Sequence, residues 1–186
     1  MNKTTFWEII QTAHDNANGN MDHKCELIKT AISELNPQEA LKFSENFDEM
    51  MDELYTWPLW GAAYVMNGGC SDDTFIDFRA SLISRGQRDF SIAINNPDDL
   101  AELDYQEDSW FYEGFSYAVS EAVESLAGEG ISRAKLPPPT PSGEEWEEEP
   151  DILSTLYPKL YRKFSHMWLD SEPLPQDTRK PWWKFW

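Results

Sequence analysis

The sequence predicts an all-α fold, a single compact multi-helix domain with a proline-rich, aromatic extension at its C-terminal end. Through most of the first 130 residues, apolar side chains recur three and four positions apart, which is the period of an amphipathic helix. Cap residues and helix breakers separate these runs, and no alternating pattern flanked by hairpin turns indicates a strand. With 186 residues, of which 40% are hydrophobic and 14% aromatic, the chain can bury a substantial core despite its charge.

The first third of the chain predicts three helices. A capping-box pattern at Thr5-Phe6-Trp7-Glu8 predicts the start of the first helix, which Asn18-Gly19-Asn20 ends. A second periodic run lies between residues 25 and 35, where Cys25 is on the apolar face and is expected to be a small core residue. Asn36-Pro37-Gln38-Glu39 then starts a third helix, with asparagine as the cap and proline at the first helical position, and this helix continues to Tyr55.

The middle of the chain predicts shorter elements. Trp57-Pro58-Leu59-Trp60 is expected to turn the chain before a short apolar helix at 61–66, which Asn67-Gly68-Gly69 ends because glycine supplies positive φ angles. Ser71 is expected to cap the next helix, and Gly86 stands where its C-terminal cap belongs. A short helix at 87–94 and an amphipathic helix at 110–126 complete the predicted helical core domain, residues 1–130.

Residues 131–186 form the predicted extension, rich in proline, glutamate and tryptophan. The run Leu136-Pro137-Pro138-Pro139-Thr140-Pro141 is stiff and extended, and five glutamates follow within 144–149. One helix is predicted at 153–164. The chain ends in an aromatic, basic tail, Trp182-Trp183-Lys184-Phe185-Trp186.

The net charge of the chain limits the classes of partner that it can bind. Acidic residues outnumber basic ones by 34 to 15, which gives a net charge of −19. A field of this sign repels phosphate backbones and anionic lipid, so we expect no nucleic-acid partner and favour a basic protein; solubility alone is the alternative reason for the acidity. No apolar run is long enough for a membrane span. Cys25 and Cys70 fit neither a disulfide framework nor a zinc site, so we expect a cytoplasmic protein with two free thiols.

Four segments carry a family resemblance. They are Phe6-Trp7-Glu8-Ile9-Ile10, Trp57-Pro58-Leu59-Trp60-Gly61-Ala62-Ala63, Asn67-Gly68-Gly69-Cys70-Ser71-Asp72-Asp73, and Phe78-Arg79-Ala80-Ser81-Leu82-Ile83-Ser84-Arg85-Gly86. On these segments the chain resembles the bacterial family called domain of unknown function 4240, over roughly residues 4 to 128. The resemblance implies a compact, mostly helical bacterial domain. It supplies no reaction, because the family takes its name from having no assigned activity.

The candidate ligand-binding residues are Asn67, Asp72, Asp73, Arg79 and Arg85. A glycine-rich turn before a helix exposes backbone N–H groups that can hold an anion, but Asp72 and Asp73 occupy that position and would repel one. The structural alternative is an internal pair between Asp72 and Arg79, which fall on one helical face. No phosphate or dinucleotide fingerprint, catalytic nucleophile, or metal-ligand spacing is found, so we expect no cofactor and assign no catalytic residue.

An acidic stretch from residue 98 to 129 holds the strongest electrostatic signal. It contains ten acids and no Lys, Arg or His, interleaved with aromatic residues. Such a surface suits a basic protein, because charge raises the encounter rate and aromatic side chains supply affinity; a solvated acidic face over core aromatics is the alternative. The candidate partner-binding residues are Asp98, Asp99, Glu102, Asp104, Glu107, Asp108, Trp110 and Tyr112, with Trp182, Trp183 and Trp186 of the tail.

The last ten residues, 177–186, carry a net positive charge. They contain three basic residues, Arg179, Lys180 and Lys184, and one acid, Asp177. Three Trp and one Phe within five residues would favour aggregation if exposed, so we expect them to bury against the domain itself, a partner's groove or a membrane interface. The leading hypothesis is therefore a non-catalytic, acidic protein-interaction domain that binds a basic protein, as an inhibitor or immunity protein does. The alternative is a small-molecule-binding or enzymatic domain with its site at residues 67–85. The sequence does not predict an oligomeric state.

Overall fold

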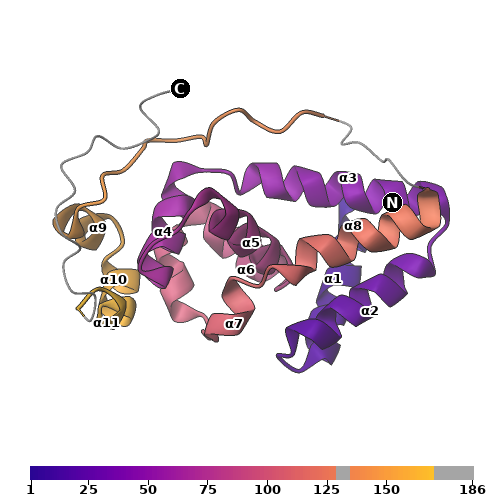
Figure 1. Ribbon diagram of the computed structural model, residues 1–186, viewed down its shortest axis with the longest axis horizontal. Coiled ribbons are helices and arrows are strands. Elements are labelled where there is room, and N and C mark those ends of the chain that lie inside the picture. Colours follow the sequence, from indigo (N-terminus) through magenta and orange to yellow (C-terminus); the bar gives the residue numbers. More distant parts are fainter. Residues whose placement is uncertain (129–134, 170–186) are drawn as a thin grey trace.

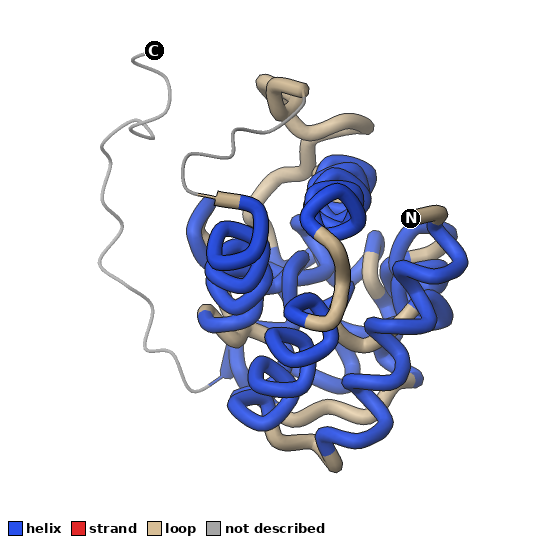
Figure 2. Tube along the Cα trace, turned by 90° about the vertical axis from the view of Figure 1, so that its right-hand side faces the viewer, coloured by secondary structure: helices blue, strands red, loops and turns tan. Residues whose placement is uncertain are grey.

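The computed structural model describes residues 1–128 and 135–169, and within these ranges every regular element is a helix, as predicted (Figures 1 and 2). The elements in chain order are α1 (Lys3–Ala17), α2 (Met21–Ser33), α3 (Pro37–Glu53), α4 (Trp57–Asn67), α5 (Asp72–Ile83), α6 (Gln87–Asn95), the 3₁₀ helix η1 (Pro97–Glu102), α7 (Glu107–Trp110), α8 (Gly114–Ala127), α9 (Pro150–Leu156), α10 (Pro158–Phe164) and α11 (His166–Leu169). No helix of the described ranges has the length and apolar character needed to cross a bilayer.

The helix starts follow from side chains that accept hydrogen bonds from the first turn. Asn36 and Glu39 form a reciprocal capping box, because the Glu39 N–H donates to the Asn36 side chain at 3.0 Å and the Asn36 amide donates to the Glu39 carboxylate at 2.8 Å. Ser71 caps α5 as predicted. The predicted cap at Thr5 is wrong: Asn2 accepts from the Thr5 N–H at 2.9 Å, so the cap lies three residues earlier and α1 begins at Lys3.

The predicted turn at Trp57-Pro58-Leu59-Trp60 is also wrong, since these residues form the first turn of α4. Thr56 provides the cap by accepting from the Leu59 N–H at 3.2 Å. Pro58 stands in this first turn, where a missing N–H breaks no helical hydrogen bond. The break at the other end is as predicted, because Gly68 and Gly69 both have positive φ, at 65° and 143°.

Two predicted helices are each split, one by a tertiary contact and one by a proline. The helix expected at 110–126 breaks between α7 and α8, where the Ser81 hydroxyl of α5 accepts from the Tyr112 N–H at 3.0 Å and donates to the Tyr112 carbonyl. The helix expected at 153–164 breaks at Tyr157, because Pro158 has no N–H to continue the first helix.

Gly86, at φ 102°, donates its N–H to the Ile83 carbonyl and directly precedes α6.

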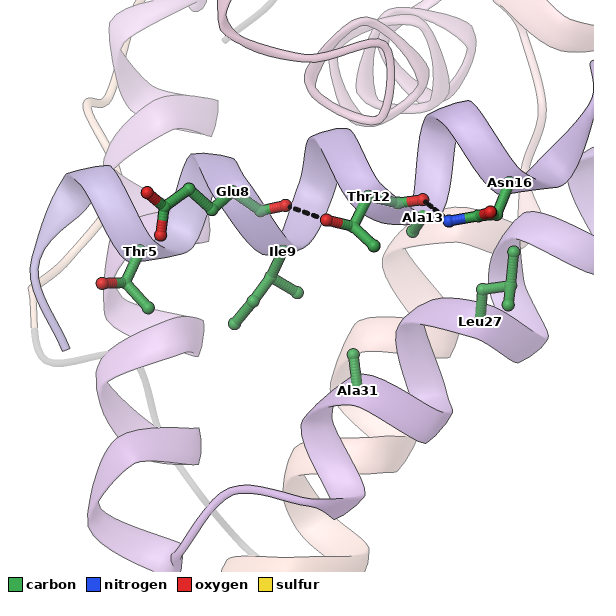
Figure 3. A pocket seen from close by; sticks show the side chains of 8 residues that line it. All are labelled: Thr5, Glu8, Ile9, Thr12, Ala13, Asn16, Leu27 and Ala31. Atoms are coloured by element: carbon green, nitrogen blue, oxygen red, sulfur yellow. Dashed lines mark hydrogen bonds between the residues drawn. The ribbon is translucent and has the colours of Figure 1, made fainter.

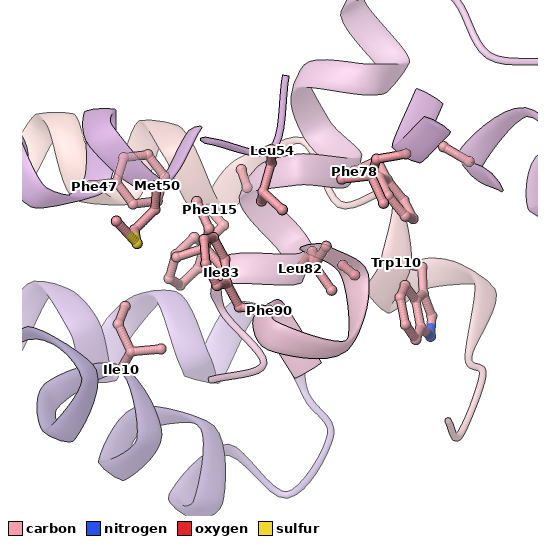
Figure 4. Close-up of a cluster of buried hydrophobic side chains, with 14 of the residues drawn as sticks. Ile10, Phe47, Met50, Leu54, Phe78, Leu82, Ile83, Phe90, Trp110 and Phe115 are labelled. Atoms are coloured by element: carbon pink, nitrogen blue, oxygen red, sulfur yellow. The ribbon is translucent and has the colours of Figure 1, made fainter. Parts of the chain in front are cut away.

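One hydrophobic core joins all these helices. Helix α2 packs against α1 and α8, α3 packs against α8, and α10 packs against α4 and η1. Figure 4 shows the centre of this core, where side chains from α1, α3, α5, α6 and α8 meet, among them Ile10, Phe47, Phe78 and Phe115. Leu153, Leu160 and Phe164 of α9 and α10 belong to the same cluster, so the described part of the predicted extension shares the core of the preceding helices.

Candidate functional site

The glycine turn between α4 and α5 is stabilised from within and contacted by the C-terminal segment. The Asn67 amide donates to the Gly69 carbonyl at 2.9 Å, and the Trp60 indole donates to the Cys70 carbonyl at 3.0 Å. A Cβ placed on Gly68 would lie 3.2 Å from the Met167 carbonyl oxygen of α11. The backbone of α11 therefore approaches this turn closely, which only a glycine at that position permits without displacement.

The two candidate arginines are used inside the fold. Arg79 is buried, donates to the Met51 carbonyl at 2.8 Å, and stacks its guanidinium over the Tyr55 and Phe75 rings. Arg85 donates to Asp89 at 2.8 Å and lies over the Trp110 ring at 4.2 Å.

The predicted acids of this site lie elsewhere. Asp72 and Asp73 are exposed in the first turn of α5, on the solvent side of the helix. The structure thus directs the predicted arginines into the core and the predicted acids outward, and it does not gather the five candidates around one ligand.

Three of the predicted partner-binding acids are already bound within the chain, one by backbone N–H groups and two by a lysine side chain. Asp98 is only 6% exposed and accepts hydrogen bonds from the Lys159 and Leu160 N–H groups, at 2.9–3.1 Å, so it caps the N-terminus of α10. Asp99 and Glu102 bind the Lys159 ammonium at 2.7 and 2.6 Å.

A second lysine completes this contact. Lys163 donates to the Ala101 and Leu103 carbonyls at the end of η1. Residues 97–103 therefore hold α10 through its capped N-terminus and through two lysines.

The remaining candidates of the stretch divide between core and surface. Trp110 is fully buried and donates its indole N–H to the Asp104 carbonyl, so it offers no surface to a partner in this conformation. The Tyr112 hydroxyl hydrogen-bonds Asp22 of α2. The Asp104 and Asp108 side chains are exposed. The side chain of Glu107 and the residues Trp182, Trp183 and Trp186 lie outside the described part of the chain.

A second acidic surface was not identified as a unit in the sequence. We define the α5–α8 acidic face as Asp73, Ile76 and Asp77 of α5 with Glu113 and Tyr117 at the start of α8. Burial, Glu113 and Asp73 together raise the pKa of Asp77 to about 6, and the two charged groups in that set are both carboxylates. Ile76 is 42% exposed and Tyr117 59% exposed, so two apolar side chains accompany the three acids.

A buried lysine also escaped sequence reasoning. Lys24 of α2 is 3% exposed and donates to the Ser84 hydroxyl at 3.1 Å, and burial lowers its pKa to about 8. Burial lowers the pKa of the neighbouring His14 as well. Nothing in the spacing of Lys24 marked it, because the residues that bury it come from segments up to 60 positions away.

Two grooves are lined in part by α2. A groove of about 230 Å³ between α1 and α2 has an apolar floor that includes Ile9 and Leu27, and its rim residues Thr12 and Asn16 donate to carbonyls of their own helix (Figure 3). A second groove, of about 490 Å³, lies between α2 and α8 beside the ion pair of Lys29 with Glu121. Among residues 1–128 and 135–169, no three His, Cys, Asp or Glu side chains are placed to hold a metal ion.

Comparison with known proteins identifies a family for this chain. A family model described as "Protein of unknown function (DUF4240)" matches residues 1–125, which end within α8. No curated protein matches the chain, and no solved structure does. The matched range contains both η1 and the α5–α8 acidic face, whereas α9 to α11 follow it.

Proposed function

The chain belongs to the DUF4240 family, and on this premise we propose that it is a non-catalytic, acidic protein-interaction domain that binds a basic protein, as inhibitors and immunity proteins do. The observation that carries the proposal is the α5–α8 acidic face. Asp77 is near enough to Glu113 and Asp73 for both to raise its pKa, and every charged group that shifts that pKa has the same sign. Carboxylates held this close are stabilised by an incoming cation, which lowers their mutual repulsion.

The same face offers more than charge. Ile76 and Tyr117 expose apolar surface next to the acids, and partially exposed tyrosines are common anchors in interfaces. Long-range attraction from a net charge of −19 would raise the rate of encounter with a basic protein, while these two side chains would slow its dissociation. The arginines of residues 67–85 are already engaged in the core, so the proposal is based on this face and not on a small-molecule site there.

The proposal is tested by capture of proteins from the source organism on immobilised full-length chain. We expect a protein of high isoelectric point to be enriched on the wild type and lost on the triple variant Asp73→Asn, Asp77→Asn, Glu113→Gln. A control variant, Glu144→Gln, Glu145→Gln, Glu147→Gln, removes the same charge from exposed positions outside the face and should retain the partner.

The association rate gives a second readout. Raising the salt concentration should slow association of the captured protein steeply, since exposed charges are screened beyond about 8–10 Å at physiological ionic strength. A partner that binds both triple variants equally, at a rate independent of salt, would contradict the proposal.

A further inference from the structure

The described chain ends beside the glycine turn that precedes α5 and the α5–α8 acidic face. Met167 of α11 contacts Gly68, with its carbonyl oxygen 3.2 Å from the position of an added Cβ. Gly68 and Asp73 are five residues apart, which limits their separation to about 18 Å, and Asp77 lies about one helical turn further along α5. The last described helix, α11, therefore lies within about 20–25 Å of Asp73 and Asp77.

The sequence beyond that point is complementary to the face. Nine residues separate Leu169 from Arg179, which is enough to span about 30 Å when extended. Residues 179–186 then bring Arg179, Lys180 and Lys184 together with Trp182, Trp183, Phe185 and Trp186, and include no acid. A segment of cations and large aromatic rings matches a surface of carboxylates flanked by exposed Ile76 and Tyr117 in both charge and apolar character.

We propose that residues 179–186 dock in cis on the α5–α8 acidic face and thereby occupy it until a basic partner displaces them. The inference rests on the proposed function in that the tail and the partner share one face. The acidic stretch at 97–103 shows the same principle in the described structure, because Lys159 and Lys163 of the C-terminal segment are bound there by Asp99, Glu102 and two carbonyls. The tail would extend this cis neutralisation to the second acidic surface.

The test uses a fluorescently labelled peptide of residues 177–186 and full-length protein, with binding followed by anisotropy. The acceptor is the variant Arg179→Glu, Lys180→Glu, Lys184→Glu, whose own tail no longer suits the face. We expect it to bind the peptide at least ~10-fold more tightly than wild type, because a tethered tail competes at an effective concentration of order millimolar. Adding Asp73→Asn, Asp77→Asn and Glu113→Gln to the acceptor should weaken binding at least ~10-fold, whereas Glu144→Gln, Glu145→Gln and Glu147→Gln should leave it unchanged.

Three results would overturn the inference. They are equal peptide affinity for wild type and the tail variant, no binding to either, and binding that survives neutralisation of the face. Sedimentation of the wild type and of the tail variant provides one more test. If the wild type is a dimer and the tail variant a monomer, the tail binds a second copy of the chain, which would contradict docking in cis. Because no partner is present in these measurements, a failure here leaves the capture experiment to decide the proposed function by itself.

Discussion

Replacing Asp98 tests whether one buried carboxylate fastens the C-terminal helices to the rest of the fold. The side chain accepts from the Lys159 and Leu160 N–H groups at the start of α10, and Asp98→Ala leaves both donors without it. Loss of an N-cap costs about 1 kcal/mol, and a buried donor left unsatisfied costs a further 1–3 kcal/mol. Lys159 N–H is near the surface and can bind water, whereas Leu160 is fully buried, so we expect a loss of about 3 kcal/mol in total.

The assay is thermal unfolding followed by circular dichroism. For a chain of this size, ~3 kcal/mol lowers Tm by about 6–12 °C. Asp98→Asn keeps one acceptor oxygen and should lose less. Asp99→Ala should lose least, because Asp99 is partly exposed and the Lys159 ammonium that it binds retains Glu102. Trypsin should also cleave Asp98→Ala faster at Lys159 and Lys163, since local opening exposes these sites. The reasoning would be refuted if Asp98→Ala had the same Tm as Asp99→Ala and was cleaved by trypsin no faster than wild type.

Three further perturbations test the glycines and the acidic face by thermal unfolding. Gly68→Val should destabilise by about 1–3 kcal/mol, because it forces a β-branched residue to φ 65° against Met167; an unchanged Tm would show that the turn rearranges freely. Gly61→Ala should destabilise by about 1–3 kcal/mol, since its Cβ would collide with the Tyr157 hydroxyl oxygen; the same substitution should cost less in a Tyr157→Phe background, which lacks that oxygen and its hydrogen bond to the Pro58 carbonyl, and an equal cost in both backgrounds would argue against this contact. Folding raises the pKa of Asp77 to about 6, so the folded state holds this proton more tightly than the unfolded chain and stability falls as pH rises from about 4 to about 6. Asp77→Asn should therefore raise Tm relative to wild type at pH 7.5 and have less effect at pH 4, and an equal effect at both pH values would exclude this origin.

The acidic stretch shows how far sequence reasoning about a site can go. The sequence shows its charge and its aromatic content, but it does not distinguish a partner surface from a solvated face. The structure gives a third arrangement for part of it: Asp98, Asp99 and Glu102 hold Lys159 of the same chain, about 60 residues away. Charge patterning along a sequence reports which residues are acidic, but it does not report which cations the fold brings to them.

The α5–α8 acidic face shows that sequence patterns also miss acids that the fold brings together. Asp77 and Glu113 are 36 positions apart in sequence, and only the packing of α5 against α8 and α7 makes them neighbours. A sequence signal existed for each part, since Glu113 belongs to the acidic stretch and Asp73 to the first turn of α5. Nothing in either signal linked the two.

Local sequence patterns were enough to predict the all-helical fold, the cap at Asn36 with Glu39 in the first turn, the Ser71 cap and the positive φ at the Gly68-Gly69 turn. Each of these depends on residues within a few positions of one another, so the necessary partners are adjacent in the chain. The tertiary structure alone decided that Ser81 interrupts the helix before α8, that Arg85 and Trp110 stack in the interior, and which acids remain exposed. Helical periodicity is a local property, and it identifies which face of each helix is buried. Which neighbouring helix packs against that face depends on side-chain volumes and on hydrogen bonds between residues tens of positions apart.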